Sequence, residues 1–295
     1  MGSVHRACGW SKQSSLQRFG STEKNCVRGV YCFGMAIVDK HPPGSFCWIE
    51  LVTTDQAAAK KFYNQLFGWA ITDSPLGPDD FYTIFKIHSR HAAAAYTMRK
   101  DQRAQGVPAH WMLYIAVENA DQAVAKAAKT GGVVVSPAYE VGDAGRMAVL
   151  QDPTGAVFSI WQSKKSSGLG INGVDGALCW ADLTTPGPDL AAKFYSNLFG
   201  WKFVPGEKDH SGYMHIKNGE DFIGGMPPAR LYSGKVPAHW LIYFGMNDVK
   251  ASAARAKQLG ASIHIGPETK DRVGTLAVLA DPQDAVFAIF KSARK

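Results

Sequence analysis

The stretch Lys61-Phe62-Tyr63-Asn64-Gln65-Leu66-Phe67-Gly68-Trp69 decides the fold, because it returns 132 residues later as Lys193-Phe194-Tyr195-Ser196-Asn197-Leu198-Phe199-Gly200-Trp201. The segments on either side repeat in the same order. Cys47-Trp48-Ile49-Glu50-Leu51 returns as Cys179-Trp180-Ala181-Asp182-Leu183, and Val107-Pro108-Ala109-His110-Trp111 returns unchanged as Val236-Pro237-Ala238-His239-Trp240. Three ordered matches of this length indicate a duplicated unit.

Each unit contains two similar halves. In the first half of the first unit, apolar residues at i and i+4 predict a helix over about 55–67, and Gly68 suits a left-handed C-terminal cap. The second half begins with a β-branched and aromatic strand over 110–117, followed by an alanine-rich helix over 119–130. Asp152-Pro153-Thr154-Gly155 then predicts a turn between two apolar strands, and 281–284 predicts its counterpart.

This doubled β-α-β-β-β pattern, with the Phe-Tyr-x-x-Leu-Phe-Gly-Trp helix end and the Asp-Pro turn, resembles the glyoxalase/bleomycin-resistance/extradiol-dioxygenase (vicinal-oxygen-chelate) superfamily. The resemblance covers nearly everything after residue 44. It implies an α+β fold of four βαβββ modules in two domains, each curled into a cup of eight strands. In that family the cup holds a divalent metal with its substrate, or a bound drug.

The expected organisation is a disordered extension over 1–44, domain 1 over 45–162, a flexible Lys/Ser/Gly-rich linker over 163–176, and domain 2 over 177–291. Because four half-units are already present in one chain, we expect a monomer with pseudo-two-fold packing of its domains. Residues 1–34 fit a transit peptide, a disordered stretch or a start chosen too far upstream, and the sequence does not choose among them.

The composition excludes several classes of protein. Of the net charge of +7, residues 1–44 carry +4, and the rest has no basic cluster interleaved with aromatic residues, which argues against nucleic-acid binding. No apolar run approaches the length of a membrane span. Three of the five cysteines lie in the extension, and Cys47 and Cys179 occupy matching strands, so we expect no disulfide framework and a cytoplasmic protein.

Strand alternation predicts which side chains face the cups. Cys47, Ile49 and Leu51 form the apolar set that helices would cover, which leaves Trp48 and Glu50 inward. The same argument applied to the other strands and to the second unit predicts ligand-binding residues Trp48, Glu50, His110, Tyr114, Trp161, Trp180, Asp182, His239 and Tyr243. Glu50 and Asp182 are the candidates for a catalytic role. An aromatic cup with few polar groups is typical of a site for a small organic ligand.

The resemblance also implies positions for metal ligands, and they are not filled here. Counting from the helix-opening Asp55 and the turn Asp152, those positions fall on Trp48, on Met112 or His110, and on Ser159; domain 2 has Ala288 at the last. These side chains do not make a divalent-metal site, so no metal ligand is predicted. A relocated set stays open: Glu50 with His110 and His88 or His91, or in domain 2 Asp182, His215 and His239. The alternative is that these histidines have no role in metal binding, and either form local hydrogen bonds or lie in exposed loops.

Two functions follow from the sequence. The first is a protein that binds a small organic molecule in its aromatic cups without the usual metal or another cofactor. The second is a glyoxalase-like lyase or isomerase, or a dioxygenase, that depends on a divalent metal such as Zn, Ni, Mn or Fe. The sequence names neither the ligand nor the cup that works. It also leaves Arg146 open, either as a contact for an anionic substrate or as a solvated side chain.

Overall fold

The computed structural model describes residues 36–78, 80–206, 210–231 and 237–293. The expectations for residues 1–34 lie outside this part of the chain. The described chain contains two eight-stranded sheets with helices, an α+β fold, as the sequence predicts.

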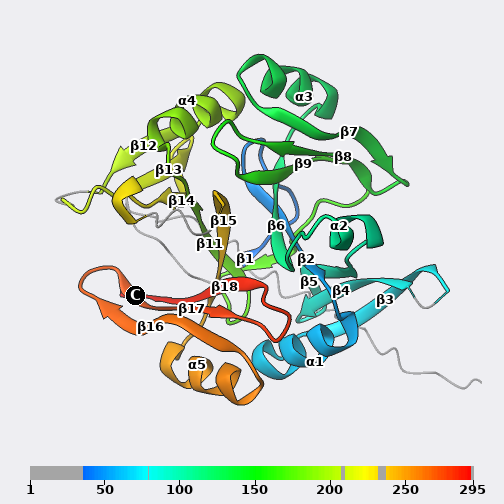
Figure 1. Ribbon diagram of the computed structural model, residues 1–295, viewed down its shortest axis with the longest axis vertical. Helices are drawn as coiled ribbons and strands as arrows, with labels where there is room; N and C mark the ends of the chain where they lie inside the picture. The colour runs from blue at the N-terminus through cyan, green and yellow to red at the C-terminus, as the bar shows by residue number, and fades with distance from the viewer. Residues whose placement is uncertain (1–35, 79, 207–209, 232–236, 294–295) are drawn as a thin grey trace, which may run out of the picture. The chain divides into compact units, whose positions relative to one another are not determined.

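Four βαβββ modules make up the two domains (Figure 1). In domain 1 they are β2 (Phe46–Thr53), α1 (Gln56–Phe67), β3 (Ala70–Gly77), β4 (Asp80–Ile87) and β5 (Arg90–Thr97), then β6 (His110–Ala116), α3 (Ala120–Lys129), β7 (Val133–Val141), β8 (Gly145–Gln151) and β9 (Val157–Ser163). A short helix, α2 (Lys100–Ala104), joins the modules. In domain 2 they are β11 (Leu178–Thr184), α4 (Pro188–Phe199), β12 (Lys202–Pro205), β13 (Met214–Asn218) and β14 (Asp221–Met226), then β15 (His239–Gly245), α5 (Val249–Gln258), β16 (Ser262–Lys270), β17 (Gly274–Ala280) and β18 (Val286–Ser292). A 3-10 turn, η1 (Ala229–Leu231), follows β14.

The strand order shows how two modules share one sheet. Domain 1 has the order β3-β4-β5-β2-β6-β9-β8-β7, and domain 2 repeats it as β12-β13-β14-β11-β15-β18-β17-β16. The first strand of each module runs parallel to its last strand, and the two first strands pair antiparallel at the centre. The residues at the centre of each sheet therefore come from the two most similar segments of the repeat.

The repeated helix forms for local reasons. Asp55 caps the N-terminus of α1 by accepting a hydrogen bond from the backbone of Ala58, and Gly68 ends the helix in the left-handed conformation with φ of 70°. Phe62 and Tyr63 are buried, as predicted for core residues. The helix thus begins and ends where the sequence predicts.

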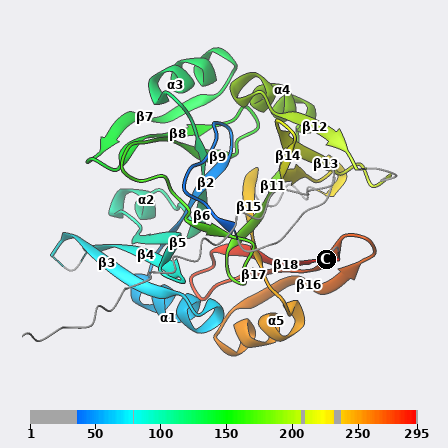
Figure 2. The same ribbon diagram turned by 180° about the vertical axis from the view of Figure 1, so that it is seen from behind.

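The two domains pack through this helix. Figures 1 and 2 show α1 beside α5 and α3 beside α4 from both sides, and contacts join both pairs. The Tyr63 hydroxyl, in domain 1, donates to Asp281 Oδ2, in the turn of domain 2, at 3.0 Å, and accepts from Trp111 Nε1 at 3.1 Å. In the other repeat Trp240 Nε1 donates to the Tyr195 hydroxyl at 3.0 Å, and the charge of Asp152 raises the pKa of Tyr195 beyond the rise that burial causes.

A second symmetric pair of contacts uses the tryptophan at the end of each repeated helix segment. Trp69 Nε1 donates to the backbone oxygen of Gly176 at 3.2 Å, and Trp201 Nε1 donates to that of Gly44 at 2.9 Å. Each indole therefore binds the segment that leads into the other domain.

Two expectations about the connecting segments do not hold for the described residues. The linker over 163–176 is not simply solvated, because Leu169 and Ile171 are buried and Leu169 donates its backbone N–H to Cys47. The end of the supposed disordered extension also takes part in the fold, since β1 (Ala36–Ile37) pairs antiparallel with β10 (Ile171–Asn172). The Lys/Ser/Gly-rich composition of the linker therefore gave no sign that Leu169 and Ile171 are buried. None of the described helices has the length and apolar character that would let it cross a membrane.

Candidate ligand-binding site

A buried carboxylate lies at the centre of each sheet, on the face opposite the helices. We call the face of the first sheet that carries Glu50 and Tyr114 cup 1, and the matching face with Asp182 and Tyr243 cup 2. Strand register fixes the members of each cup, because paired residues share a face: Trp48 pairs with Tyr114, and Tyr114 with Ser159. Trp161 belongs to the same face, opposite Met147.

In cup 1 two tyrosines donate to the two oxygens of Glu50. The Tyr82 hydroxyl lies 2.6 Å from Oε1 and the Tyr114 hydroxyl lies 2.5 Å from Oε2. Trp48 Nε1 donates to the Tyr82 hydroxyl at 3.2 Å. Glu50 is only 7% exposed, so it is an ionisable group held inside the protein by hydrogen bonds alone.

Cup 2 repeats this arrangement with a shorter acid. The Tyr213 hydroxyl donates to Asp182 Oδ1 at 2.5 Å and the Tyr243 hydroxyl donates to Oδ2 at 2.9 Å. Trp180 Nε1 lies 2.9 Å from both Asp182 Oδ1 and the Tyr213 hydroxyl. Asp182 is 6% exposed. A carboxylate, two tyrosines and a tryptophan therefore converge in both cups, although Tyr82 and Tyr213 were not among the predicted site residues.

The absence of a side chain at Gly225 explains how Asp182, shorter than glutamate, reaches Tyr213. Gly225 pairs with Asp182 on the neighbouring strand, and a Cβ at Gly225 would collide with the Tyr213 hydroxyl. Cup 1 has Ala94 at this position beside Glu50. The glycine lets Tyr213 lie against the sheet, close enough for an aspartate.

Burial sets the electrostatics of both clusters. It raises the pKa of Glu50 above its ordinary value, and the hydrogen bonds from Tyr114 and Tyr82 offset part of that rise. Burial likewise raises the pKa of Asp182, against its three hydrogen-bond donors and the charge of Lys270. The pKa of each bonded tyrosine is raised well above its usual range, first by burial and then by the neighbouring carboxylate. The tyrosines therefore remain protonated donors.

The walls of the cups are aromatic and apolar. In cup 1 the Tyr139 hydroxyl donates to Met147 Sδ at 3.1 Å, and Tyr114 also faces this sulfur. In cup 2 the wall is a small apolar cluster separate from the main core: Leu241, Tyr243, Val278 and Ala288, with Cys179, Trp180, Leu276, Val286 and Phe290 packed against it. Around each carboxylate, Trp161, Tyr96, Trp180 and Phe290 keep part of their surface exposed.

The remaining predicted residues lie at the edges of this arrangement. His110 and His239 each place Nδ1 on the backbone oxygen two residues earlier, at 2.8 and 2.9 Å, which is the local bonding that the sequence left open. Trp161 Nε1 donates to the backbone oxygen of Ser166 at 3.0 Å. Their role in ligand binding stays a prediction.

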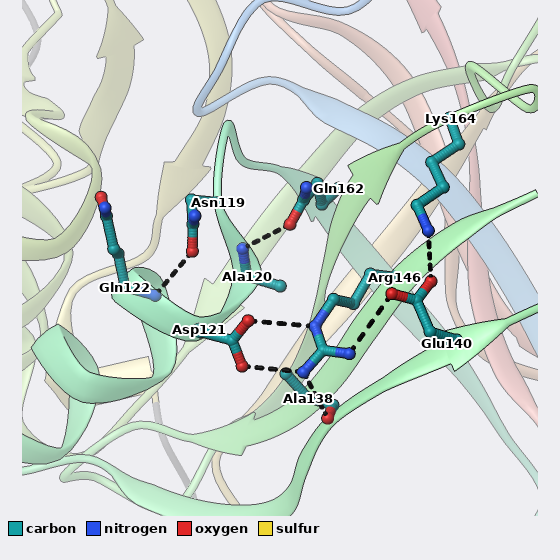
Figure 3. Close-up of polar contacts among 9 residues, drawn as sticks. All are labelled: Asn119, Ala120, Asp121, Gln122, Ala138, Glu140, Arg146, Gln162 and Lys164. Atoms are coloured by element: carbon teal, nitrogen blue, oxygen red, sulfur yellow. Dashed lines mark hydrogen bonds and ion pairs between the residues drawn. The ribbon is translucent and has the colours of Figure 1, made fainter.

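Arg146 does not face cup 1. Its guanidinium binds both oxygens of Asp121, on helix α3, at 2.8 and 3.1 Å, and also pairs with Glu140, which pairs in turn with Lys164 (Figure 3). This network joins β7 and β8 to the helix on the other face of the sheet. Arg146 is therefore occupied by structural ion pairs.

The donor set does not fit a divalent metal. At the positions where the family places ligands, the Trp48 indole N–H is a donor bound to Tyr82, and the Ser159 side chain offers only a hydroxyl. Within the described ranges, no three His, Cys, Asp or Glu side chains lie together as metal ligands would, so neither relocated set converges. His91, for example, packs edgewise on Trp48 with ring centroids 6.0 Å apart.

The fold and this site define a two-domain protein of the vicinal-oxygen-chelate type, and comparisons with known proteins agree. A model of the Glyoxalase/Bleomycin resistance protein/Dioxygenase superfamily matches residues 45–160, and a model of the glyoxalase-like domain matches residues 180–290. The chain belongs to this superfamily.

Its relatives carry several functions. CFP32 of Mycobacterium tuberculosis, a proposed glyoxylase by its name, is 39% identical over 250 residues, which cover 83% of this chain and 94% of the relative. The anthracycline biosynthesis protein DnrV of Streptomyces peucetius is 32% identical, covering 84% and 93%. Among solved structures, the Mn(II)-bound glyoxalase of Novosphingobium aromaticivorans has a TM-score of 0.59 at 16% identity, covering 84% of this chain and 82% of its own. This solved structure shares the fold.

Proposed function

We propose that this protein binds a small, largely aromatic organic molecule in its cups without the metal of its superfamily. The observation that carries the proposal is the cluster that both cups repeat: one buried carboxylate, two tyrosines and a tryptophan. A few convergent polar groups in an aromatic, apolar setting are the usual anatomy of a small-molecule site. The carboxylate would accept a hydrogen bond from the ligand, and the aromatic walls would pack on its body.

Two further features support a ligand in the cups. The edge strand β7 leaves Val133, Tyr139 and Val141 between 38% and 54% exposed, and Tyr139 and Val141 pair with Met147 and Gly145 of β8. Ser159 is fully buried on the cup face, and its Oγ has no hydrogen-bond partner among the described residues. Buried hydroxyls nearly always have a partner, so a polar group of a ligand or a bound water would complete this site.

Binding can be tested with 4-tert-butylphenol, an uncharged probe with one hydroxyl donor. We expect calorimetric titration to show saturable binding and a rise in Tm. The double variant Glu50→Gln, Asp182→Asn should weaken it about tenfold, since a hydrogen bond to a charged acceptor contributes roughly 1.5 kcal/mol or more. Glu140→Gln removes one negative charge on the other face of the first sheet and is the control. Absence of binding, or equal weakening by the control, would overturn the proposal.

Metal independence has its own test. Elemental analysis of the purified protein should find no stoichiometric Zn, Ni, Mn or Fe, and a chelator should leave Tm unchanged. A stoichiometric metal whose removal lowers Tm would contradict this part of the proposal and favour the metal-dependent lyase or dioxygenase.

A second candidate, a proton-transfer enzyme without metal, is favoured by the raised pKa of both carboxylates, because burial that raises a pKa is how an acid or base is tuned for use near neutrality. Exchange of the α-hydrogens of an enolisable aromatic ketone in D₂O, followed by NMR, tests it. Exchange that Glu50→Gln and Asp182→Asn abolish would support catalysis; exchange at the uncatalysed rate would leave binding alone.

A further inference from the structure

The two cups share a polar centre but differ in the side chains around it. In cup 1 two more tyrosines surround Glu50. Tyr96 pairs with Val52, two residues along β2 from Glu50, and Tyr139 pairs with Met147. The charge of Glu50 raises the pKa of both, after the rise from burial. Because Tyr96 and Tyr139 come from opposite halves of the sheet, the carboxylate lies among aromatic rings on several sides.

Cup 2 places different residues at the same points of the register. Pro227, next after the β14 residues that flank Asp182, stands where cup 1 has Tyr96. Glu268 pairs with Leu276 as Tyr139 pairs with Met147, and Lys270 pairs with Gly274 as Val141 pairs with Gly145. Lys270 binds Glu268 at 3.1 Å, and its positive charge lowers the pKa of Asp182 against the effect of burial.

The carboxylates therefore differ in charge compensation. No described Lys, Arg or His forms an ion pair with either carboxylate, but the charge of Lys270 acts on Asp182, whereas the groups that lower the pKa of Glu50 are the two tyrosine donors. The charge of Arg99 acts on both rim tyrosines, but its side chain is 68% exposed and paired with Asp101 at 3.1 Å. The pKa of His110 and that of His91 are lowered by burial, so both are neutral at neutral pH. Cup 1 thus holds an uncompensated anion among aromatic rings.

A carboxylate surrounded by aromatic rings is complementary to an organic cation. Faces of Trp and Tyr attract an ammonium group through their quadrupoles, most strongly where water is excluded. A carboxylate within the same enclosure adds a charge–charge attraction, which low dielectric strengthens. An entering cation would also offset the cost of keeping Glu50 ionised while buried. An uncharged ligand gains none of these terms.

We propose that cup 1 binds an organic cation, an alkylammonium group carried on an apolar body, whereas cup 2 takes an uncharged ligand. The inference rests on the proposed function and assigns a ligand class to each cup. In cup 1 the ammonium lies over Glu50 between Trp48, Tyr82, Tyr96 and Tyr139. In cup 2 Pro227 and Glu268 stand in place of Tyr96 and Tyr139, and the positive charge of Lys270 acts on Asp182.

A pair of isosteric probes separates charge from shape: (4-hydroxyphenyl)trimethylammonium and 4-tert-butylphenol. We expect the cation to bind one site per chain, about tenfold more tightly than the isostere binds that site. Glu50→Gln should remove this preference, so that cup 1 binds both probes with about equal affinity, whereas the matched Asp182→Asn should keep the preference of cup 1 for the cation. Since the cation favours ionised Glu50, its affinity should fall as the pH is lowered through the pKa of that acid.

Two further variants change partly exposed side chains outside the two buried clusters. Tyr139→Leu changes a side chain that is 45% exposed and should weaken the cation selectively, by about threefold. Lys270→Met should create a second cation site, raising the stoichiometry from one to two. Equal affinity of both probes for cup 1, or loss of cation binding in Asp182→Asn, would overturn the inference while the proposed function stands. Failure of both probes to bind would overturn both.

Discussion

Replacing Tyr63 by Phe tests whether the repeated helix segment holds the two domains together. The lost hydroxyl donates to the buried Asp281 and accepts from Trp111. A hydrogen bond to a charged group contributes about 1.5–3 kcal/mol, and a buried indole N–H left without a partner costs about 1 kcal/mol or more, so we expect a loss of about 3 kcal/mol. For a protein of this size that corresponds to a fall in Tm of about 6–12 °C.

The pH dependence of this loss can also be worked out. Burial raises the pKa of Asp281, and the bond from Tyr63 is among the contacts that lower it again. In Tyr63→Phe the folded-state pKa therefore rises further. For an acid with a raised folded-state pKa, the stability contribution is present below the unfolded pKa and is lost as pH rises through the folded one. The variant should lose more stability at about pH 8 than at about pH 5.

Urea unfolding followed by circular dichroism measures these differences. Tyr195→Phe should also destabilise the protein, because it removes the matching contact with Trp240. Tyr139→Phe is the control, since its hydroxyl contacts only a methionine sulfur among the described groups, and it should stay within about 0.5 kcal/mol of the parent. A Tyr63→Phe variant as stable as this control, or a loss independent of pH, would refute the argument.

Three other expectations can be measured directly. Glu50→Gln should flatten the decline in stability as pH rises through the raised pKa of Glu50, which pH-resolved melting curves would show; an unchanged profile would mean that Glu50 does not titrate there. Gly225→Ala should displace Tyr213 from Asp182 and lower the free energy of unfolding by about 1–3 kcal/mol. The matching change in cup 1, Ala94→Gly, involves no such collision and is the control. Equal effects of the two variants in urea unfolding would argue against the close approach of Tyr213 to Gly225. Size-exclusion chromatography with light scattering should give a mass near 32.0 kDa, because each repeat already packs against the other; a mass twice that would contradict a monomer.

The fold was predictable because its signals are local and appear twice. The left-handed Gly68 and the alternation around Glu50 depend on neighbours in sequence, and each has a counterpart 132 residues later. The cap at Asp55 is also local, although the second repeat has Gly187 there, followed by Pro188 at the start of α4. Strand alternation also placed Trp48 and Tyr114 on one face, where the register confirms them.

Local sequence patterns did not predict Tyr82 and Tyr213, the tyrosines that bind the buried carboxylates together with Tyr114 and Tyr243. Tyr82 reaches Glu50 from a strand that is not adjacent to β2, so their contact depends on the curvature of the sheet. The alternation of Phe81-Tyr82-Thr83-Ile84-Phe85 carried a usable signal for Tyr82, whereas Tyr213 lies just before β13. Buried Leu169 and Ile171 were missed because composition averages over a segment, whereas burial is decided one side chain at a time.

Fusion of the two repeats in one chain has a consequence for the cups. A homodimer of single domains would have two identical cups, since one sequence supplies both. Here both repeats keep the contacts of the repeated helix segment: Tyr63 with Trp111 and Tyr195 with Trp240 within each domain, and Trp69 and Trp201 each bound to the opposite connecting segment. The cups differ instead at Glu50 and Asp182, at Ala94 and Gly225, and at Tyr139 and Glu268. Packing thus depends on residues that the repeats share, whereas the side chains around the common polar centre of the cups differ, which leaves each cup free to suit its own ligand.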